Sequence, residues 1–86
     1  MPRISEFYGI AIYLYYQDHA PPHFHAIYGE YEATISIGSG TVLDGRLPRR
    51  ALGLVRTWTG LHREELERDW NLARQGKPLR PINPLE

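Results

Sequence analysis

One segment, "HFHAIYGEYEATISI" (residues 23–37), constrains the fold more than any other part of the chain. Apolar and polar residues alternate on both sides of Gly29-Glu30, as in two strands that each bury one face. Glycine at the first position of a two-residue loop is typical of a type II′ turn, so the segment predicts a β-hairpin. The loop also fixes the register, with Tyr28 opposite Tyr31 and the other pairs following along both strands.

This register divides the side chains of the hairpin between two faces, because successive side chains of a strand point to opposite sides of the sheet. One face collects an apolar set, which predicts a core: Phe24, Ala26, Tyr28, Tyr31, Ala33 and Ile35. The other face collects a largely polar set: His23, His25, Ile27, Glu32, Thr34 and Ser36. The two histidines are therefore predicted to share the face that is turned away from the main core.

The segments on either side of the hairpin predict further strands. The alternating segment "YGIAIYLYY" (8–16) is rich in β-branched and aromatic residues and predicts the first strand. The segment "QDHAPP" (17–22) predicts a loop, because its two prolines cannot donate to a ladder. A short last strand is expected at 41–43, before a turn. We thus expect an antiparallel sheet of three or four strands, at about 8–16, 23–28, 31–37 and 41–43.

Helical spacing begins after the sheet. The apolar residues that follow it are Leu47, Ala51, Leu54, Val55 and Trp58. Gly60 followed by Leu61 predicts a helix stop with glycine at the C′ position and Leu61 reaching back towards Val55. We therefore expect two helices, at about 48–59 and 62–75, packed on one face of the sheet.

The C-terminal tail, residues 77–86, has Pro78, Pro81 and Pro84 at a period of three, which is a polyproline II pattern. We expect this tail to pack back on its own domain as a strap; the alternative is that it serves as a ligand for a partner's groove. A chain of 86 residues suffices for one domain, so the predicted fold is a single α+β domain over residues 1–86.

Composition narrows the chemistry and the location. The chain has no cysteine, so a metal ion must be held by His, Asp or Glu side chains. The N-terminus lacks a basic region followed by an apolar run, and the longest apolar stretch is too short to span a bilayer. We expect a cytoplasmic protein without membrane contact. Because so small a domain buries a modest share of its surface, a homodimer is an open alternative.

A metal site is one hypothesis for the histidines. His23 and His25, two residues apart on one strand, point the same way and can offer two imidazoles to one ion such as Zn²⁺ or Ni²⁺. His19 or Asp18, on the preceding loop, could complete the shell, and Glu32 lies diagonally across the hairpin from His25. The alternative is a polar face that carries imidazoles beside hydroxyl groups and needs no cofactor.

Acid–base catalysis is a second hypothesis. His19, His23 and His25 could act as proton donor and acceptor in a small metal-independent ribonuclease, since imidazole titrates near neutral pH. Tyr13 and Tyr15 are expected on the same face as these histidines. A phosphate group would need a cation, for which the candidates are Arg46, Arg49 and Arg50.

The charges are unevenly spread along the chain although they sum to zero. Residues 1–45 carry one arginine against five acidic side chains, and residues 46–86 carry nine basic side chains against five acidic ones. Arg49 and Arg56 are expected on the exposed side of the first helix. That surface predicts binding to RNA or to an acidic partner, unless the acidic half of the domain lies next to it.

The segments "MPRISEFYGI", "QDHAPPHFHA", "YGEYEA" and "HREEL" give the chain a resemblance to the short prokaryotic proteins grouped as domain of unknown function 4160. The resemblance extends over essentially the whole chain. That family has no established activity, so it implies no catalytic residues. Its genes often stand beside a second small family, domain of unknown function 2442, which implies a toxin–antitoxin-like pair, and some members are labelled transcriptional regulators.

Two functions follow as expectations. The first is an interaction component of a two-gene toxin–antitoxin-like or stress module that binds a small protein encoded next to it. The second is an enzyme, either a ribonuclease or a metal hydrolase, that uses the His19, His23 and His25 cluster.

Overall fold

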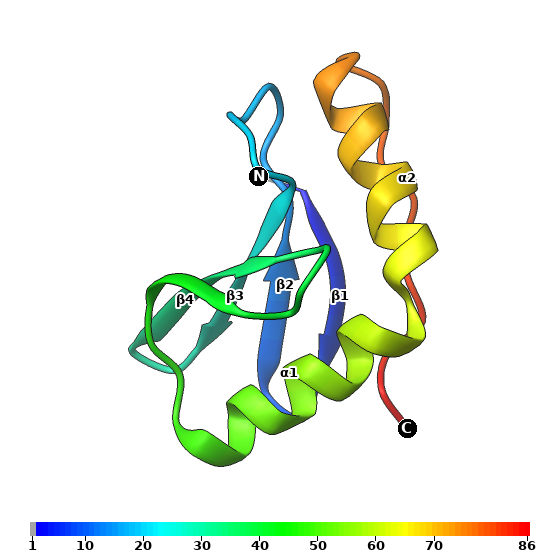
Figure 1. Ribbon diagram of the computed structural model, residues 1–86. Helices are drawn as coiled ribbons and strands as arrows, with labels where there is room; N and C mark the ends of the chain where they lie inside the picture. The colour runs from blue at the N-terminus through cyan, green and yellow to red at the C-terminus, as the bar shows by residue number, and fades with distance from the viewer. Residues whose placement is uncertain (1) are drawn as a thin grey trace.

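The computed structural model describes residues 2–86 as an antiparallel sheet with two helices (Figure 1). The strands are β1 (Arg3–Phe7), β2 (Ile10–Tyr13), β3 (His23–Tyr28), β4 (Tyr31–Ser36) and β5 (Val42–Gly45), followed by the helices α1 (Arg49–Leu61) and α2 (Arg63–Arg74). Each strand pairs with the next one in the chain, so the sheet is a meander. The segment that follows α2 turns back along that helix (Figure 1), and Asp69 of α2 accepts a hydrogen bond from the backbone N–H of Arg80.

The predicted α+β class is confirmed, but the predicted number of strands is wrong. Five strands form the sheet, because residues 3–7 pair with residues 10–13 around a turn at Tyr8-Gly9. Both turn residues have positive φ, 51° and 79°, so the strand expected over residues 8–16 begins only at Ile10. A register irregularity in β1 leaves the adjacent Ile4 and Ser5 both buried, so the period-two signal of a strand is absent from that segment.

The register predicted for the β3–β4 hairpin is confirmed at all six pairs, from Tyr28 opposite Tyr31 to His23 opposite Ser36. The core face is confirmed for four of its six members, which are almost fully buried: Phe24, Ala26, Ala33 and Ile35. The two tyrosines beside the turn are more exposed. Trp58 of α1 is fully buried and packs its ring against those of Phe7 and Phe24.

The predicted role of Gly60 is wrong, because α1 continues through it to Leu61. The helix ends at His62, whose φ of −123° leaves helical geometry while its N–H bonds to the carbonyl oxygens of Trp58 and Thr59. The side chain of Leu61 is 66% exposed and does not cover the core as expected. The two helices are nonetheless separate, and the break places Leu66 and Trp70 of α2 in the core.

The C-terminal tail contains neither helix nor strand among the described residues. Ile82 is buried, and its N–H donates to the carbonyl oxygen of Ile4 at 2.8 Å, at the free edge of β1. The indole N–H of Trp58 donates to the carbonyl oxygen of Asn83 at 2.8 Å. The polyproline conformation and the strap role of this segment stay predictions. Neither α1 nor α2 is long and apolar enough to cross a membrane, within the part of the chain that the structure describes.

Candidate metal centre

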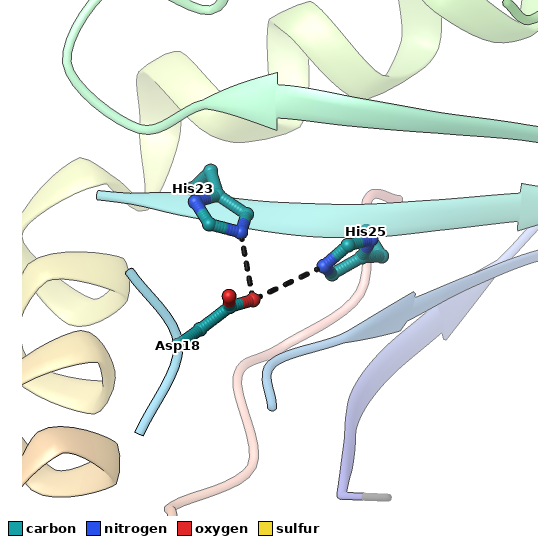
Figure 2. Close-up of side chains that lie close together, drawn as sticks. All are labelled: Asp18, His23 and His25. Atoms are coloured by element: carbon teal, nitrogen blue, oxygen red, sulfur yellow. Dashed lines mark hydrogen bonds and ion pairs between the residues drawn. The ribbon is translucent and has the colours of Figure 1, made fainter. Parts of the chain in front are cut away.

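Three side chains from two segments converge at the start of β3. Asp18 lies on the loop between β2 and β3, and His23 and His25 are the first and third residues of β3 (Figure 2). One potential ligand atom from each of the three lies within 4.8 Å of the others. We call these three residues the Asp-His-His cluster.

The loop is tied at both ends, and this folds Asp18 over the strand. Gln17 has a φ of 57°, in the left-handed region, and its N–H donates to the carbonyl oxygen of Ala73 at the end of α2. On the far side, the carbonyl oxygen of Pro22 accepts the N–H of Ile37 at 3.0 Å. Asp18 lies between these two anchors, so its carboxylate is brought to the histidines by contacts far away in the sequence.

The distances within the cluster suit a shared cation. Oδ2 of Asp18 lies 2.8 Å from Nε2 of His23 and 3.5 Å from Nε2 of His25. Two ligand atoms that each bind a tetrahedral zinc ion at ~2.0–2.1 Å lie about 3.3 Å apart. The observed separations fall on either side of that value, so small side-chain movements suffice to place an ion between the three atoms.

The hydrogen bonds of His23 point to the same conclusion. Its Nδ1 lies 2.7 Å from the carbonyl oxygen of Pro21, and a carbonyl oxygen can only accept, so Nδ1 carries a proton. The other nitrogen, Nε2, faces the carboxylate of Asp18, which is also an acceptor. Either a second proton on Nε2 or a cation beside it is needed to make this contact attractive.

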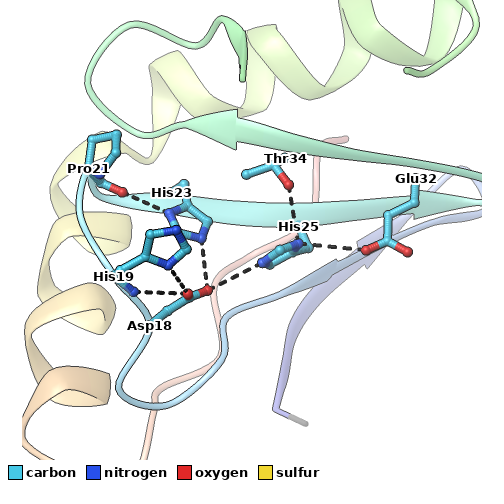
Figure 3. Close-up of polar contacts among 7 residues, drawn as sticks. All are labelled: Asp18, His19, Pro21, His23, His25, Glu32 and Thr34. Carbon is cyan, nitrogen blue, oxygen red and sulfur yellow. Dashed lines mark hydrogen bonds and ion pairs between the residues drawn. The ribbon is translucent and has the colours of Figure 1, made fainter. Parts of the chain in front are cut away.

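His25 is held from the side opposite Asp18 (Figure 3). Its Nδ1 lies 3.5 Å from Oγ1 of Thr34 and 3.7 Å from Oε2 of Glu32. The ring of Tyr15 packs on the imidazole, with centroids 4.3 Å apart. Metal-binding histidines commonly direct their second nitrogen at a carboxylate, a backbone carbonyl or water, and here His23 faces the carbonyl of Pro21 and His25 the carboxylate of Glu32.

Asp18 is held in its ionised form. Burial alone would raise the pKa of its carboxyl group, but hydrogen bonds from the backbone and side chain of His19 and from the side chain of His23 outweigh it and lower the pKa to about 2. Burial raises the pKa of the nearby Tyr15, and the negative charge of Glu32 raises it further. The cluster therefore offers a carboxylate rather than a carboxylic acid at neutral pH.

The face that carries the histidines is more enclosed than the sequence predicts. His23 is 5% exposed, because the ring of Trp70 from α2 packs on it and Asp18 covers its outer edge. The prediction that His23 and His25 share a face is confirmed by the register. The covering by α2 and by the loop depends on tertiary contacts that no local pattern encodes.

A hollow of about 410 Å³ adjoins the cluster. Besides the cluster and His19, its walls are formed by Pro21, Thr34, Leu43 and Asp44. Leu43 and Asp44 belong to β5, so the edge of the sheet forms one side of this hollow. A small molecule that enters it would reach the histidines from solvent.

Two other residues of the predicted metal set lie at the margin of the cluster. The side chain of His19 is 90% exposed, and its Nδ1 bonds to Oδ1 of Asp18 at 2.9 Å, so His19 orients the carboxylate. Glu32 approaches the outer nitrogen of His25. Asp18, which the sequence offers only as an alternative to His19, holds the central position. Its adjacency to the histidine segment is the sole sequence signal for it.

The arginines predicted for phosphate do not join the histidines. The guanidinium of Arg46 lies over the ring of Tyr31, 5.4 Å from its centre, and Tyr31 belongs to the core face of β4. Arg50 borders a separate hollow with Tyr28, at the opposite end of β3 from His23. Arg49 and Arg56 are exposed on α1. A site that combines these arginines with the histidines is therefore not formed in this arrangement.

Comparison with known proteins gives a family but no function. A family model described as a domain of unknown function, DUF4160, matches residues 9–71. No curated protein and no solved structure is significantly similar to the chain. The match contains the whole Asp-His-His cluster and Trp70, while β1, the end of α2 with Ala73 and the C-terminal tail lie outside it. The chain thus belongs to the DUF4160 family.

Proposed function

We propose that this protein binds one divalent transition metal ion through Asp18, His23 and His25 and uses it for metal-assisted hydrolysis. The observation that carries the proposal is the convergence of one carboxylate oxygen and two Nε2 atoms within 4.8 Å of one another. Two histidines and one carboxylate are a common ligand set of catalytic zinc sites. Three protein ligands leave a position for water, and a metal ion lowers the pKa of that water so that it can attack a substrate.

A metal site fits the cluster better than metal-independent acid–base catalysis. A general base needs a ring nitrogen that is free to accept a proton from the substrate. In His23, Nδ1 donates to the carbonyl oxygen of Pro21 and Nε2 faces the carboxylate of Asp18, which favours a cation or a second proton at Nε2 over a free base. The arginines that a ribonuclease would use on phosphate also lie elsewhere.

The donor atoms favour zinc or nickel over magnesium or calcium. Imidazole nitrogens suit Zn²⁺, Ni²⁺ and Cu²⁺, whereas Mg²⁺ and Ca²⁺ take oxygen ligands. The carbonyl oxygen of Pro21 and the hydroxyl of Thr34 fix the outer nitrogens of the two rings, which orients Nε2 of each ring towards the ion. The protein can then hold the ion with little rearrangement.

The test is a cobalt titration of the purified, metal-free protein, since Co²⁺ substitutes for Zn²⁺ and its visible absorption reports coordination. We expect one equivalent to bind, with the intense bands of a four- or five-coordinate site, and zinc to displace it. The His62→Gln variant serves as control and should bind normally. Weak octahedral bands only, or unchanged binding in the Asp18→Asn, His23→Gln double variant, would refute the metal site. Failure of the loaded protein to cleave ester, amide or phosphodiester probes would refute the hydrolase.

A second candidate is an interaction component of a toxin–antitoxin-like or stress module. It is favoured by Arg49 and Arg56, two exposed cations on α1 that have no ion-pair partner among residues 2–86. These side chains suit an acidic surface of a small protein encoded nearby. Co-purification with that neighbour, lost in an Arg49→Glu, Arg56→Glu variant, would support this role. Absence of any complex would exclude it.

A further inference from the structure

A β-bulge at the edge of the sheet shapes the hollow beside the cluster. Thr34 of β4 pairs with Asp44, and the next residue, Ile35, pairs with Val42, so Leu43 is an extra residue on β5. In a regular strand, Leu43 and Asp44 would point to opposite faces. Both instead line the same hollow. Bulges commonly redirect a side chain in this way at sheet edges and beside binding sites.

The bulge brings together an apolar group and an unpaired negative charge. Leu43 is 47% exposed, although it is a large apolar side chain. Asp44 has no hydrogen-bond or ion-pair partner among the side chains of residues 2–86, whereas Asp18 on the other wall is fully engaged. None of the described residues that line the hollow is lysine or arginine. The electrostatic potential in the hollow is therefore determined by the carboxylates and by the cation that the cluster binds.

The distance between neighbouring strands determines how far Asp44 lies from the cluster. His25 pairs with Thr34 and Thr34 pairs with Asp44, so the three side chains stand in one row on one face. Neighbouring strands lie ~4.8 Å apart, which places Asp44 about 10 Å from His25 along this row. Nε2 of His25 faces Asp18, on the side away from Thr34 and Asp44. A molecule that reaches from the ion to Asp44 therefore passes Leu43 and spans about 10 Å, or about eight bonds.

We propose that Asp44 and Leu43 form the specificity wall of the metal centre and select a ligand that carries an ammonium group and a small apolar group. This inference rests on the proposed metal function and adds the ligand class to it. Asp44 pairs with the ammonium group, Leu43 contacts the apolar group, and a carbonyl oxygen of the ligand turns towards the ion. A ligand that carries a carboxylate or phosphate at the Asp44 end is disfavoured, because no lysine or arginine among the described lining residues stands beside Asp44.

The test uses the full chain loaded with one equivalent of zinc and the amide NMR signals of Leu43 and Asp44. The probe is the peptide amide Leu-Gly-Gly-NH2, whose ammonium group and last carbonyl oxygen can lie about 10 Å apart, with its N-acetyl derivative for comparison. We expect saturable shifts with the peptide amide, at least tenfold weaker binding of the N-acetyl derivative, and a tenfold loss in Asp44→Asn. Glu30→Gln, which removes an exposed carboxylate at the β3–β4 turn, is the control and should bind like the parent. 6-Aminohexanamide, which has a similar span without a peptide N-terminus, distinguishes a free amine from a peptide N-terminus as the source of the ammonium group.

The outcomes separate this inference from the metal centre itself. Zinc binding is followed independently by the shifts of His23 and His25. Normal zinc binding together with equal affinity for the N-acetyl derivative, or with full affinity for the peptide amide in Asp44→Asn, would overturn the specificity wall and leave the metal centre standing. Absence of zinc binding would remove both. A Leu43→Ala variant that binds the peptide amide more weakly but binds ammonium itself normally would locate the apolar contact on β5.

Discussion

Two histidine–carboxylate contacts in this molecule look alike locally and differ in their surroundings. His62, at the junction of α1 and α2, has Nδ1 2.6 Å from Oε1 of Glu65, three residues later. His25 in the Asp-His-His cluster has nearly the same side-chain exposure, 15% against 16%. Burial therefore does not distinguish the two histidines.

The difference lies in how many segments supply polar groups. The His62 pair is made within one turn of chain, and no third metal-ligating side chain converges on it among the described residues. The cluster joins a loop to a strand, is fixed by groups on β4 and is covered by α2. A local pair stabilises a helix start, whereas convergence of ligands from separate segments builds a site that can bind an ion.

The largest expected effect is the loss of metal affinity in His23→Gln. Removing one of three protein ligands should weaken zinc binding by about 100-fold or more, since the remaining ligands no longer enclose the ion. The matched variant His62→Gln should change the affinity less than twofold. Competition titration with a zinc indicator measures both. Equal losses of zinc affinity in the two variants would show that the Asp-His-His cluster does not differ from the His62–Glu65 pair in zinc binding.

The next effect separates stability from binding. Ile82→Ala removes a buried side chain of the C-terminal tail and should lower the free energy of unfolding by ~2–4 kcal/mol. Hydrogen bonds of the described tail join it to Ile4, Trp58 and Asp69, which lie outside the cluster, so the zinc affinity of the folded protein should stay unchanged. Urea unfolding and zinc titration test the two parts. A loss of affinity in the folded variant would show that the tail also holds the cluster.

A smaller effect is expected from the group behind His25. Thr34→Val keeps the shape of the side chain and removes the hydroxyl beside Nδ1, so zinc affinity should fall about tenfold. Thr57→Val is the control, because its hydroxyl bonds within α1 to the carbonyl oxygen of Gly53. Competition titration with a zinc indicator measures the affinity of both variants. If the control variant weakens zinc as much as Thr34→Val does, the orienting role of Thr34 is refuted.

The smallest effect concerns acid stability without metal. The pKa of Asp18 is about 2 in the folded protein against a usual 3.8, so the unfolded chain takes up the proton first as pH falls. The stabilisation from Asp18 is therefore complete above pH 3.8 and is lost as pH drops towards 2. Urea unfolding from pH 5 to pH 2 should show a shallower decline in Asp18→Asn than in the parent. Parallel declines would contradict this role of Asp18.

The hairpin could be predicted from the sequence in detail, because local rules determine it. Gly29-Glu30 sets the turn, and alternation along both strands then leaves one register that buries Phe24 and Ile35. The shared face of His23 and His25 follows from the same rules. Comparable local rules are absent from β1, where the bulge breaks the alternation, so the sequence does not predict this strand.

The rest of the site depends on contacts distant in sequence. Asp18 reaches the histidines because α2 accepts the N–H of Gln17, and His23 is buried because Trp70 covers it. The prediction that α1 ends at Gly60 is wrong for a related reason. The local sequence permits a helix end at Gly60, but the helix continues and ends at His62. Local patterns predicted which residues share a face, and tertiary packing decided which of them converge.

The most direct test of the central claim is a two-dimensional NMR spectrum of the four imidazole rings, recorded before and after one equivalent of zinc. We predict saturable shifts of His23 and His25, a smaller change at His19 through its bond to Asp18, and no change at His62. Unchanged signals of His23 and His25, or shifts of all four rings in proportion to added zinc, would contradict a metal centre at the Asp-His-His cluster.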